Sequence, residues 1–100
     1  MKVLRVTFPN GIQYDIPVEV IARHRAAYYA DEFEGDAERS YQEDTLPLFW
    51  QDPYEAEDWA ENNMDWNDVF THARQVDPKP MTSRDYELGW IDGEKELVDL

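Results

Sequence analysis

The sequence predicts an α+β fold: a small antiparallel sheet, led by an N-terminal β-hairpin, with three to four helices packed on one face. Three observations support this prediction. Apolar and polar residues alternate on both sides of Pro9-Asn10-Gly11, as they do in strands with one buried face. Apolar residues recur at helical spacing in the segments that follow. The 100 residues are 42% hydrophobic and 14% aromatic, which is enough for one core.

The hairpin is expected at about residues 2–8 and 12–16. Asn10-Gly11 lies between the two arms, and this dipeptide favours the positive φ angles that tight hairpin turns require. The residues expected on the buried face are Leu4, Val6, Phe8, Ile12, Tyr14 and Ile16.

The first helix is expected from Val18 to about Asp31, because Pro17 suits the first position of a helix. Gly35 should end this helical run. The residues expected on its inward face are Val20, Ile21, His24, Ala27 and Tyr28.

A second helix is expected from Asp36, which can cap it, to about Asp44, since Pro47 should stop a longer one. Asp52 and Glu55 resemble a capping box at the start of a third helix, with Pro53 at its first position. The inward residues expected of this third helix are Ala56, Trp59, Ala60 and Asn63.

Asn62-Asn63 should end the third helix in a left-handed turn. Asp65 can cap a last short helix, whose apolar residues are Trp66, Val69, Phe70 and Ala73.

The pattern weakens toward the C-terminus. Residues 72–77 are a candidate third strand, Tyr86–Ile91 is either strand or irregular, and residues 94–100 are expected to fray. Because no repeat or domain boundary is visible, residues 1–100 are expected to form a single domain.

The net charge of -14 is concentrated in the middle of the chain. Residues 31–68 carry fourteen acidic side chains and one basic side chain, that of Arg39. Such a field repels nucleic acids and anionic membranes and attracts basic partners. Direct binding to nucleic acid or to a membrane is therefore not expected, whereas a basic protein partner is.

Several kinds of site find no support in the sequence. The chain has no cysteine, so disulfides and thiolate zinc sites are excluded. An EF-hand loop with Gly35 or Gly93 at its sixth position would place Ala30 or Leu88 at the first ligand position. No metal or cofactor is therefore expected. With no apolar segment of membrane-spanning length and no apolar leader, the protein is expected to be cytoplasmic.

Enzyme activity is the least favoured alternative. A small hydrolase would need a histidine paired with a carboxylate, and His24 and His72 are the candidates. His24 lies on the apolar side of the first helix, where a structural role is more common. No catalytic residue is therefore assigned.

The acidic segment exceeds what solubility requires, since a net charge of about 2–8 in magnitude suffices for a small domain. The sequence therefore suggests a non-enzymatic binding protein that presents a carboxylate surface to a basic partner. In its sharpest form this partner is a protein whose nucleic-acid groove the carboxylates block by mimicry. The alternative is a solvated face that only maintains solubility. The candidate partner-binding residues are Glu34, Glu38, Glu43, Asp44, Glu55, Glu57, Asp58, Glu61 and Asp68.

A second functional alternative is an interaction module for an ordinary protein partner. Trp50 and Trp90 fit no helical stripe, and tryptophan is enriched in interfaces. Both are candidates for apolar contacts at a partly exposed surface. The expected oligomeric state is a monomer or a weak dimer.

Three segments carry a resemblance to known sequences. They are VTFPNGIQYDIP of residues 6–17, RAAYYA of residues 25–30 and YEAEDWAENNMDWNDV of residues 54–69. Together they resemble small acidic proteins of bacteria, phages and mobile elements, a group with no established activity. The resemblance implies no catalytic residue. Some unrelated small acidic phage proteins act as DNA mimics, which is an analogy of composition and setting.

Overall fold

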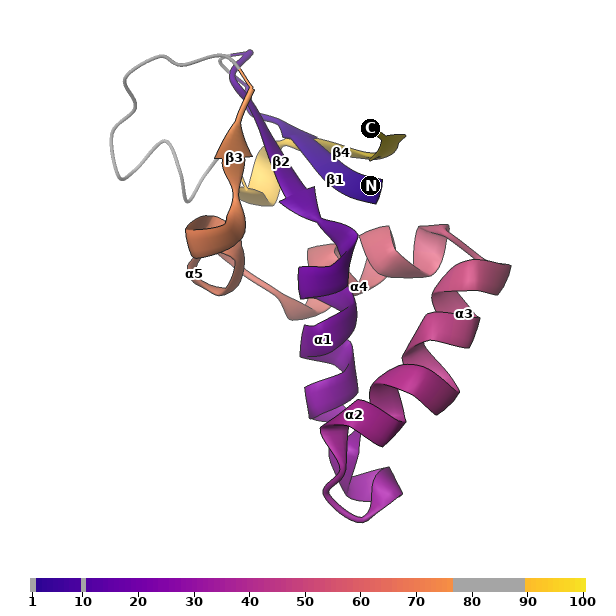
Figure 1. The fold of residues 1–100 in the computed structure, drawn as a ribbon. Coiled ribbons are helices and arrows are strands. Elements are labelled where there is room, and N and C mark those ends of the chain that lie inside the picture. Colours follow the sequence, from indigo (N-terminus) through magenta and orange to yellow (C-terminus); the bar gives the residue numbers. More distant parts are fainter. Residues whose placement is uncertain (1, 10, 77–89) are drawn as a thin grey trace.

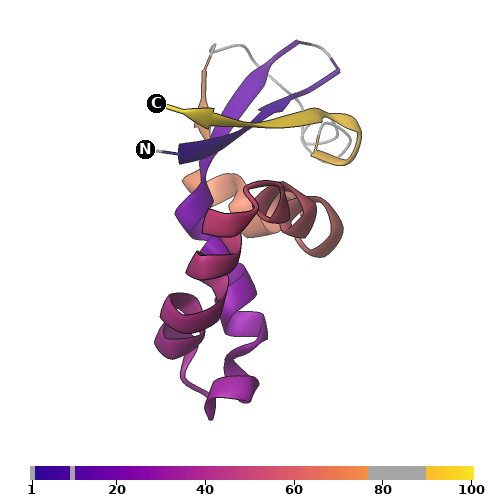
Figure 2. The ribbon, with the colours of Figure 1, turned by 90° about the vertical axis from the view of Figure 1, so that its right-hand side faces the viewer.

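The computed structural model describes residues 2–9, 11–76 and 90–100, and it shows the α+β fold that the sequence predicts. Helices lie under one face of a four-stranded antiparallel sheet, and α1 runs away from that sheet (Figures 1 and 2). The predicted N-terminal hairpin and the helical layer on one face are confirmed. The prediction for residues 86–89 lies outside the described residues, and Trp90 and Ile91, which were expected in a strand or in irregular structure, are helical.

The sheet has the strand order β3-β2-β1-β4. Its strands are β1 (Lys2–Thr7), β2 (Gln13–Pro17), β3 (Arg74–Gln75) and β4 (Glu94–Asp99). Of the candidate strand at residues 72–77, only Arg74–Gln75 forms a strand, β3, while His72 belongs to a 3-10 turn and residue 77 lies outside the described residues. The expected fraying of residues 94–100 is wrong, because β4 pairs with the whole of β1 and Leu97 packs against the core opposite Leu4.

The inner face of the sheet is the main part of the core. All six residues predicted to be buried there are at most 6% exposed. Phe8 and Tyr14 form an aromatic cluster with Trp66, with ring centroids 5.2–5.6 Å apart. On the opposite face, Arg5 donates two hydrogen bonds to the carboxylate of Asp15, at 2.8 and 3.0 Å.

The hairpin turn requires a glycine. The N–H of Phe8 donates to the carbonyl of Ile12 at 2.8 Å, and the N–H of Gly11 donates back to the carbonyl of Phe8 at 2.8 Å. Gly11 has a φ of 87°, a left-handed conformation that side chains disfavour.

Helix α1 (Val18–Tyr28) begins directly after Pro17, as predicted, but its buried face is rotated from the predicted one. The buried residues are Ile21, Ala22 and Ala26. Tyr28 is 68% exposed, so its assignment to the core is wrong. The helix ends earlier than expected, and a 3-10 turn, η1 (Ala30–Phe33), follows it.

The middle segment is one continuous helical run rather than two separated pieces. It consists of α2 (Ala37–Ser40), the π-helical turn η2 (Tyr41–Thr45) and α3 (Leu46–Gln51). Asp36 caps it as predicted, accepting the N–H of Arg39 at 3.0 Å. The expected break at Pro47 is wrong, because Pro47 lies in the first turn of α3, directly after the wider π turn.

Helix α4 (Tyr54–Asn63) begins where predicted, since the carboxylate of Asp52 accepts the N–H of Tyr54 at 3.1 Å. Ala56, Trp59 and Ala60 are buried, whereas Asn63 is exposed. The helix ends in the extended residue Met64, with a φ of -124°, so the predicted left-handed stop is wrong.

The predicted cap at Asp65 is confirmed. Asp65 and Asp68 form a reciprocal capping box at the start of α5 (Trp66–Val69), and the 3-10 turn η3 (Phe70–His72) follows. Val69 is fully buried, but Phe70 is 50% exposed, so its predicted place in the core is wrong.

Candidate partner-binding surface

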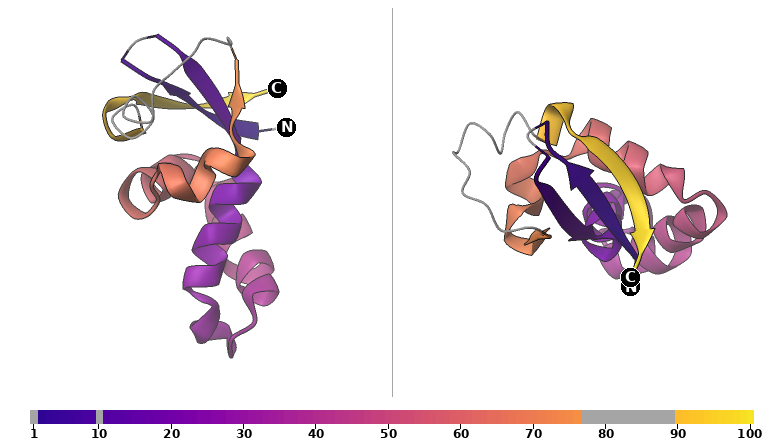
Figure 3. Two further views of the ribbon diagram at one scale, coloured as in Figure 1. Left: turned by 90° about the vertical axis from the view of Figure 1, so that its left-hand side faces the viewer. Right: turned by 90° about the horizontal axis from the view of Figure 1, so that it is seen from above.

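Helix α4 and strand β4 bring acidic residues from two distant parts of the chain together. They contact each other, and α3 and α4 extend past the β4 edge of the sheet (Figure 3, right). Glu57 and Glu61 lie on α4, while Asp92, Glu94 and Glu96 lie on or next to β4. We call these five carboxylates the α4–β4 acidic surface.

Glu57 shows that this surface is electrostatically crowded. The pKa of Glu57 is raised, first by burial and then by the negative charges of Glu61 and Glu96, while Lys95 acts in the opposite direction. A carboxylate whose ionised form is disfavoured by its neighbours gains from an incoming cation.

Two cations lie near this group: Arg5, which is opposite Glu96 in the sheet but pairs with Asp15, and Lys95, whose ammonium is directed into the protein. The Nζ of Lys95 donates to the carbonyls of Trp90 at 2.7 Å and Gly93 at 3.2 Å, and it lies 5.0 Å from the centre of the Trp90 ring. Burial lowers the pKa of Lys95, an effect that Glu61, Glu57 and Asp92 oppose. Within the described part of the chain, no carboxylate forms a direct ion pair with it.

Three of the nine predicted partner-binding carboxylates are neutralised by arginines in the helices far from the sheet. Glu38 pairs with Arg23, Glu43 with Arg39, and Asp44 with Arg25 at 2.9 Å. Hydrogen bonds from Gln42 and then Arg23 lower the pKa of Glu38. The arginines Arg23 and Arg25 come from α1, and this cross-helix pairing could not be seen in the sequence.

The remaining predicted carboxylates fall into two groups. Glu34 lies at the far end of the helical region with a φ of 59°, and Asp68 is engaged in the α5 capping box. Glu55, Glu57, Asp58 and Glu61 all lie on α4. Of these four, the structure brings Glu57 and Glu61 beside β4, together with Asp92, Glu94 and Glu96, which the sequence analysis missed.

Two large aromatic side chains project from the α3–α4 junction next to these carboxylates. Trp50 is 85% exposed and Tyr54 is 75% exposed. The expectation that Trp50 is available for contacts is confirmed as far as exposure is concerned. The same expectation for Trp90 is wrong, since it is 3% exposed and its indole donates to the carbonyl of Met64 at 3.0 Å.

A chain of hollows follows β4 on this side of the molecule. The first, of about 300 Å³, is mostly apolar and is bordered by Trp50 and Leu97. The second, of about 500 Å³, shares Pro53 and Leu97 with the first. The third, of about 410 Å³, shares Lys95 and Glu96 with the second. We call this continuous depression the β4 groove.

The residues that line the β4 groove are contributed by the sheet edge and by three helices. They are Lys2, Thr7, Val18, Ala22, Leu46, Phe49, Trp50, Pro53, Tyr54, Ala56, Glu57, Glu94, Lys95, Glu96 and Leu97. The groove is thus apolar near Trp50 and acidic near Glu57 and Glu96.

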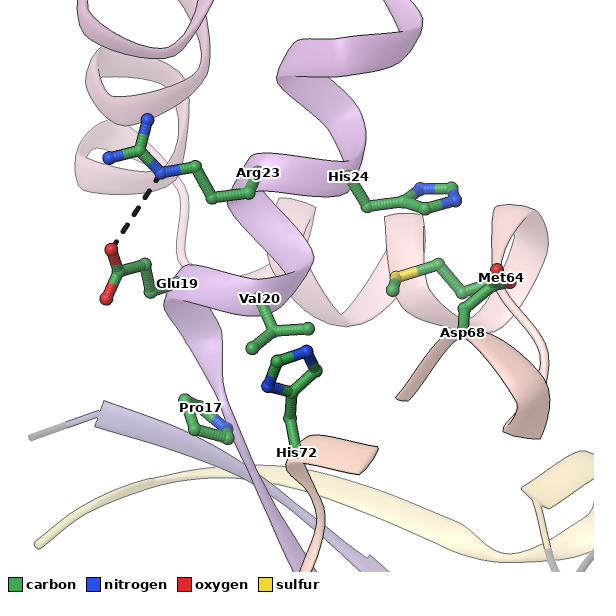
Figure 4. A pocket seen from close by; sticks show the side chains of 8 residues that line it. All are labelled: Pro17, Glu19, Val20, Arg23, His24, Met64, Asp68 and His72. Carbon is green, nitrogen blue, oxygen red and sulfur yellow. Dashed lines mark ion pairs between the residues drawn. The ribbon is translucent and has the colours of Figure 1, made fainter. Parts of the chain in front are cut away.

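A separate hollow of about 590 Å³ contains both histidines (Figure 4). His24 and His72 line it from α1 and η3, together with Met64 and Asp68. The indole N–H of Trp59 donates to Nδ1 of His24 at 2.9 Å, which leaves the proton of the neutral imidazole on Nε2. His24 therefore presents a donor to the hollow.

The histidine hollow brings the carboxylate of Asp68 to the same lining as the two histidines. Among residues 2–9, 11–76 and 90–100, neither imidazole forms an ion pair with a carboxylate, and the ion pair at its rim joins Glu19 to Arg23 at 3.8 Å. The same residues contain no group of three or more side chains arranged to hold a metal ion.

None of the helices among the described residues combines the length and apolar character needed to cross a membrane. Comparisons with protein-family models, with curated proteins and with solved structures found no match. Function therefore has to be inferred from the residues of this chain.

Proposed function

We propose that this protein is a non-enzymatic binding protein that uses the α4–β4 acidic surface and the β4 groove to bind a basic segment of a protein partner. The observation that carries this proposal is the gathering of five carboxylates, none of which forms a direct ion pair within the described part of the chain, beside an apolar groove with an 85% exposed tryptophan.

The charge supports a basic partner. The ionised form of Glu57 is disfavoured first by burial and then by the charges of Glu61 and Glu96, so a lysine or arginine placed beside it relieves repulsion as well as forming an attraction. The overall charge of -14 also attracts a cationic partner over a distance, which speeds association and makes it sensitive to salt.

The aromatic residues support a partner segment that is apolar as well as basic. Exposing Trp50 and Tyr54 to water contributes nothing to the stability of the fold. Tryptophan and tyrosine often dominate the energy of interfaces when a partner covers them. Because Trp50 borders the apolar end of the groove, an apolar partner side chain there would cover both the ring and the hollow.

Nucleic-acid mimicry is a narrower form of this proposal. A mimic needs a row of unpaired negative charges over a large area. Arginines neutralise Glu38, Glu43 and Asp44, so these three carboxylates are less suited to such a role than the α4–β4 acidic surface. Fewer carboxylates are needed to bind a short basic segment than to block a duplex-binding groove. The apolar groove can contribute to binding a short segment with apolar side chains, but it has no role in mimicking a duplex.

The test is binding of a synthetic ten-residue peptide of alternating lysine and leucine, measured by fluorescence anisotropy at several salt concentrations. The double variant Glu57→Lys/Glu61→Lys should weaken binding by at least about tenfold, or about 1.4 kcal/mol. The matched control Asp31→Lys/Glu32→Lys makes the same charge change in η1, at the far end of the helical region, and should change affinity much less.

Trp50→Ala should also weaken peptide binding, whereas Phe70→Ala removes an exposed aromatic from another surface and should not. Equal losses in the α4 and η1 charge variants would show that net charge alone attracts the peptide. That result, or the absence of binding, would overturn the proposal. Competition by duplex DNA or by heparin for a natural basic partner would favour the mimic form.

A further inference from the structure

Strand β4 forms one edge of the sheet. In the order β3-β2-β1-β4 it has β1 as a neighbour on one side and no strand of the described chain on the other. Edge strands expose a row of backbone donors and acceptors, and proteins usually block such edges with lysines, prolines, bulges or a covering element.

The hydrogen bonds at the opposite edge of the sheet, between β2 and β3, show which backbone groups of β4 face outward. The N–H of Val76 in the β3 segment donates to the carbonyl of Gln13 at 2.9 Å, so Gln13 faces β3. Consecutive residues of a strand direct their backbone N–H and carbonyl groups toward opposite neighbouring strands, so those of Ile12 and Tyr14 face β1. The bond from the N–H of Phe8 to the carbonyl of Ile12, 2.8 Å long, agrees with this assignment.

The same alternation continues through β1. Since Val6 lies opposite Tyr14, it directs its backbone groups toward β2, and Arg5 directs its groups toward β4. Arg5 lies opposite Glu96, which places the N–H and carbonyl of Glu96 in the β1–β4 ladder. The residues of β4 whose backbone groups face away from β1 are therefore Lys95, Leu97 and Asp99.

Among the described residues, the features of this edge that oppose strand pairing are its charged side chains, which include the inward-pointing Lys95. Lys95 is the lysine of β4, but its ammonium is bound to the carbonyls of Trp90 and Gly93 and does not extend over the edge. The strand contains no proline. Three alternate residues thus offer donors and acceptors at the spacing that another strand requires.

There is room for another strand beside β4. An added strand lies about 4.8 Å from its neighbour. The space beside β4 is the β4 groove, and residues of α3 and α4 line two of its three hollows, where these helices extend past the sheet (Figure 3, right). Side chains of an added strand that point toward the helices would meet Trp50, Tyr54 and Glu57.

The charges around the edge select the occupant. Glu94 and Glu96 would flank an added strand on one face of the sheet, and Glu57 and Glu61 lie on the other side. Cross-strand pairs of opposite charge stabilise a sheet, whereas like charges destabilise it. A second copy of this chain would add another acidic β4, so self-pairing is disfavoured and a basic strand is favoured.

We infer that a basic, partly apolar segment of the partner binds as a fifth strand on the outer edge of β4, with its apolar side chains in the β4 groove. This inference rests on the proposed function and specifies its binding mode. Backbone hydrogen bonds to Lys95, Leu97 and Asp99 supply the geometry, and the carboxylates and Trp50 supply the selectivity.

The test is amide hydrogen exchange by NMR, with and without a saturating alternating lysine–leucine peptide. In the unbound protein, the amides of Glu94, Glu96 and Val98 should exchange slowly, and those of Lys95, Leu97 and Asp99 should exchange quickly. Peptide binding should slow the second group by at least about tenfold. If the peptide binds without this alternate protection, strand addition is overturned and the proposed function stands; if it does not bind, both fall.

A pair of variants tests the same edge by affinity. Asp99→Pro removes one outward N–H and leaves the β1–β4 ladder intact, whereas Asp99→Asn makes the same charge change and keeps the N–H. We expect Asp99→Pro to bind the peptide about fivefold to tenfold more weakly than Asp99→Asn, the loss expected for one hydrogen bond. Equal affinities would overturn the inference. So would sedimentation that shows a β4-protected dimer of the protein without peptide.

Discussion

At the scale of single residues, Ser40 is the least satisfied polar group in the interior. Its side chain is fully buried, and its hydroxyl has no hydrogen-bond partner among the described residues. A buried hydroxyl without a partner costs free energy that an apolar side chain of similar size does not.

We therefore predict that Ser40→Ala raises the free energy of unfolding by about 1 kcal/mol. Urea denaturation followed by circular dichroism measures the change. Thr45→Ala is the matched control, since the buried hydroxyl of Thr45 accepts a hydrogen bond from Arg25 at 2.9 Å and its loss should destabilise the protein. A loss of stability in Ser40→Ala would show that its hydroxyl has a partner after all.

Glu57 makes a prediction about pH. Its pKa is raised in the folded protein, so at intermediate pH the folded state binds a proton more tightly than the unfolded chain does. The stability that this difference contributes is fully present below the ordinary glutamate pKa of about 4.3 and is lost as the pH rises through the folded pKa of Glu57.

Glu57→Gln should remove this component, so the variant gains stability over the wild type as the pH rises from about 4 to about 7. Denaturant midpoints across that range measure the difference. Glu32→Gln, at an exposed position in η1, serves as the control. If the denaturant midpoints of wild type and Glu57→Gln change in parallel with pH, the pKa of Glu57 is not raised in the folded protein and the α4–β4 acidic surface is not crowded.

At the scale of helices and strands, local signals in the sequence predicted most starts correctly. Asp36 and Asp65 cap helices as expected, because a cap involves only the next two or three residues. Asp52 accepts the N–H of Tyr54, but the expected capping box with Glu55 is wrong, since the residue before α4 is Pro53 and makes no side-chain cap. The hairpin followed from alternation and from Asn10-Gly11. These features depend on neighbours in the sequence, and a single sequence contains that information.

Long-range pairing was not predictable in the same way. Strand β4 is mostly charged, and the core contact of Leu97 becomes apparent only when β1 lies beside it. The arginines that neutralise Glu38 and Asp44 are 15 and 19 residues away on another helix. Two of the five carboxylates of the acidic surface, those on α4, were therefore predicted, and the three on or next to β4 were missed.

Helix α5 provides a test of local capping. It has four residues, so its stability depends strongly on the reciprocal bonds between Asp65 and Asp68. Asp65→Ala should lower the free energy of unfolding by about 1 kcal/mol, the usual cost of a lost N-cap. Asn67→Ala, an exposed position of the same helix, should change it little. An equal effect of both substitutions, measured by urea denaturation, would contradict a specific role for the cap.

At the scale of the whole molecule, the negative charge is divided into two regions with different properties. In the helices far from the sheet, arginines approach the carboxylates and Glu38 has a lowered pKa. At the α4–β4 acidic surface, the carboxylates approach one another and Glu57 has a raised pKa. Net charge alone describes neither region, because position decides whether a carboxylate stabilises the fold.

This division predicts opposite effects for two substitutions that change the net charge equally. At about 0.01 M salt, Glu57→Gln should raise the Tm because it removes repulsion, and Glu38→Gln should lower the Tm because it removes the partner of Arg23. At about 0.15 M salt the Debye length falls from about 30 Å to about 8 Å, so both Tm shifts should become smaller.

The wild-type Tm should rise over the same range, since repulsion dominates in a chain of charge -14. Thermal denaturation of the three proteins at both salt concentrations measures these shifts. If both substitutions raise the Tm by the same amount, net charge governs stability, and the separate acidic surface proposed for partner binding loses its electrostatic basis.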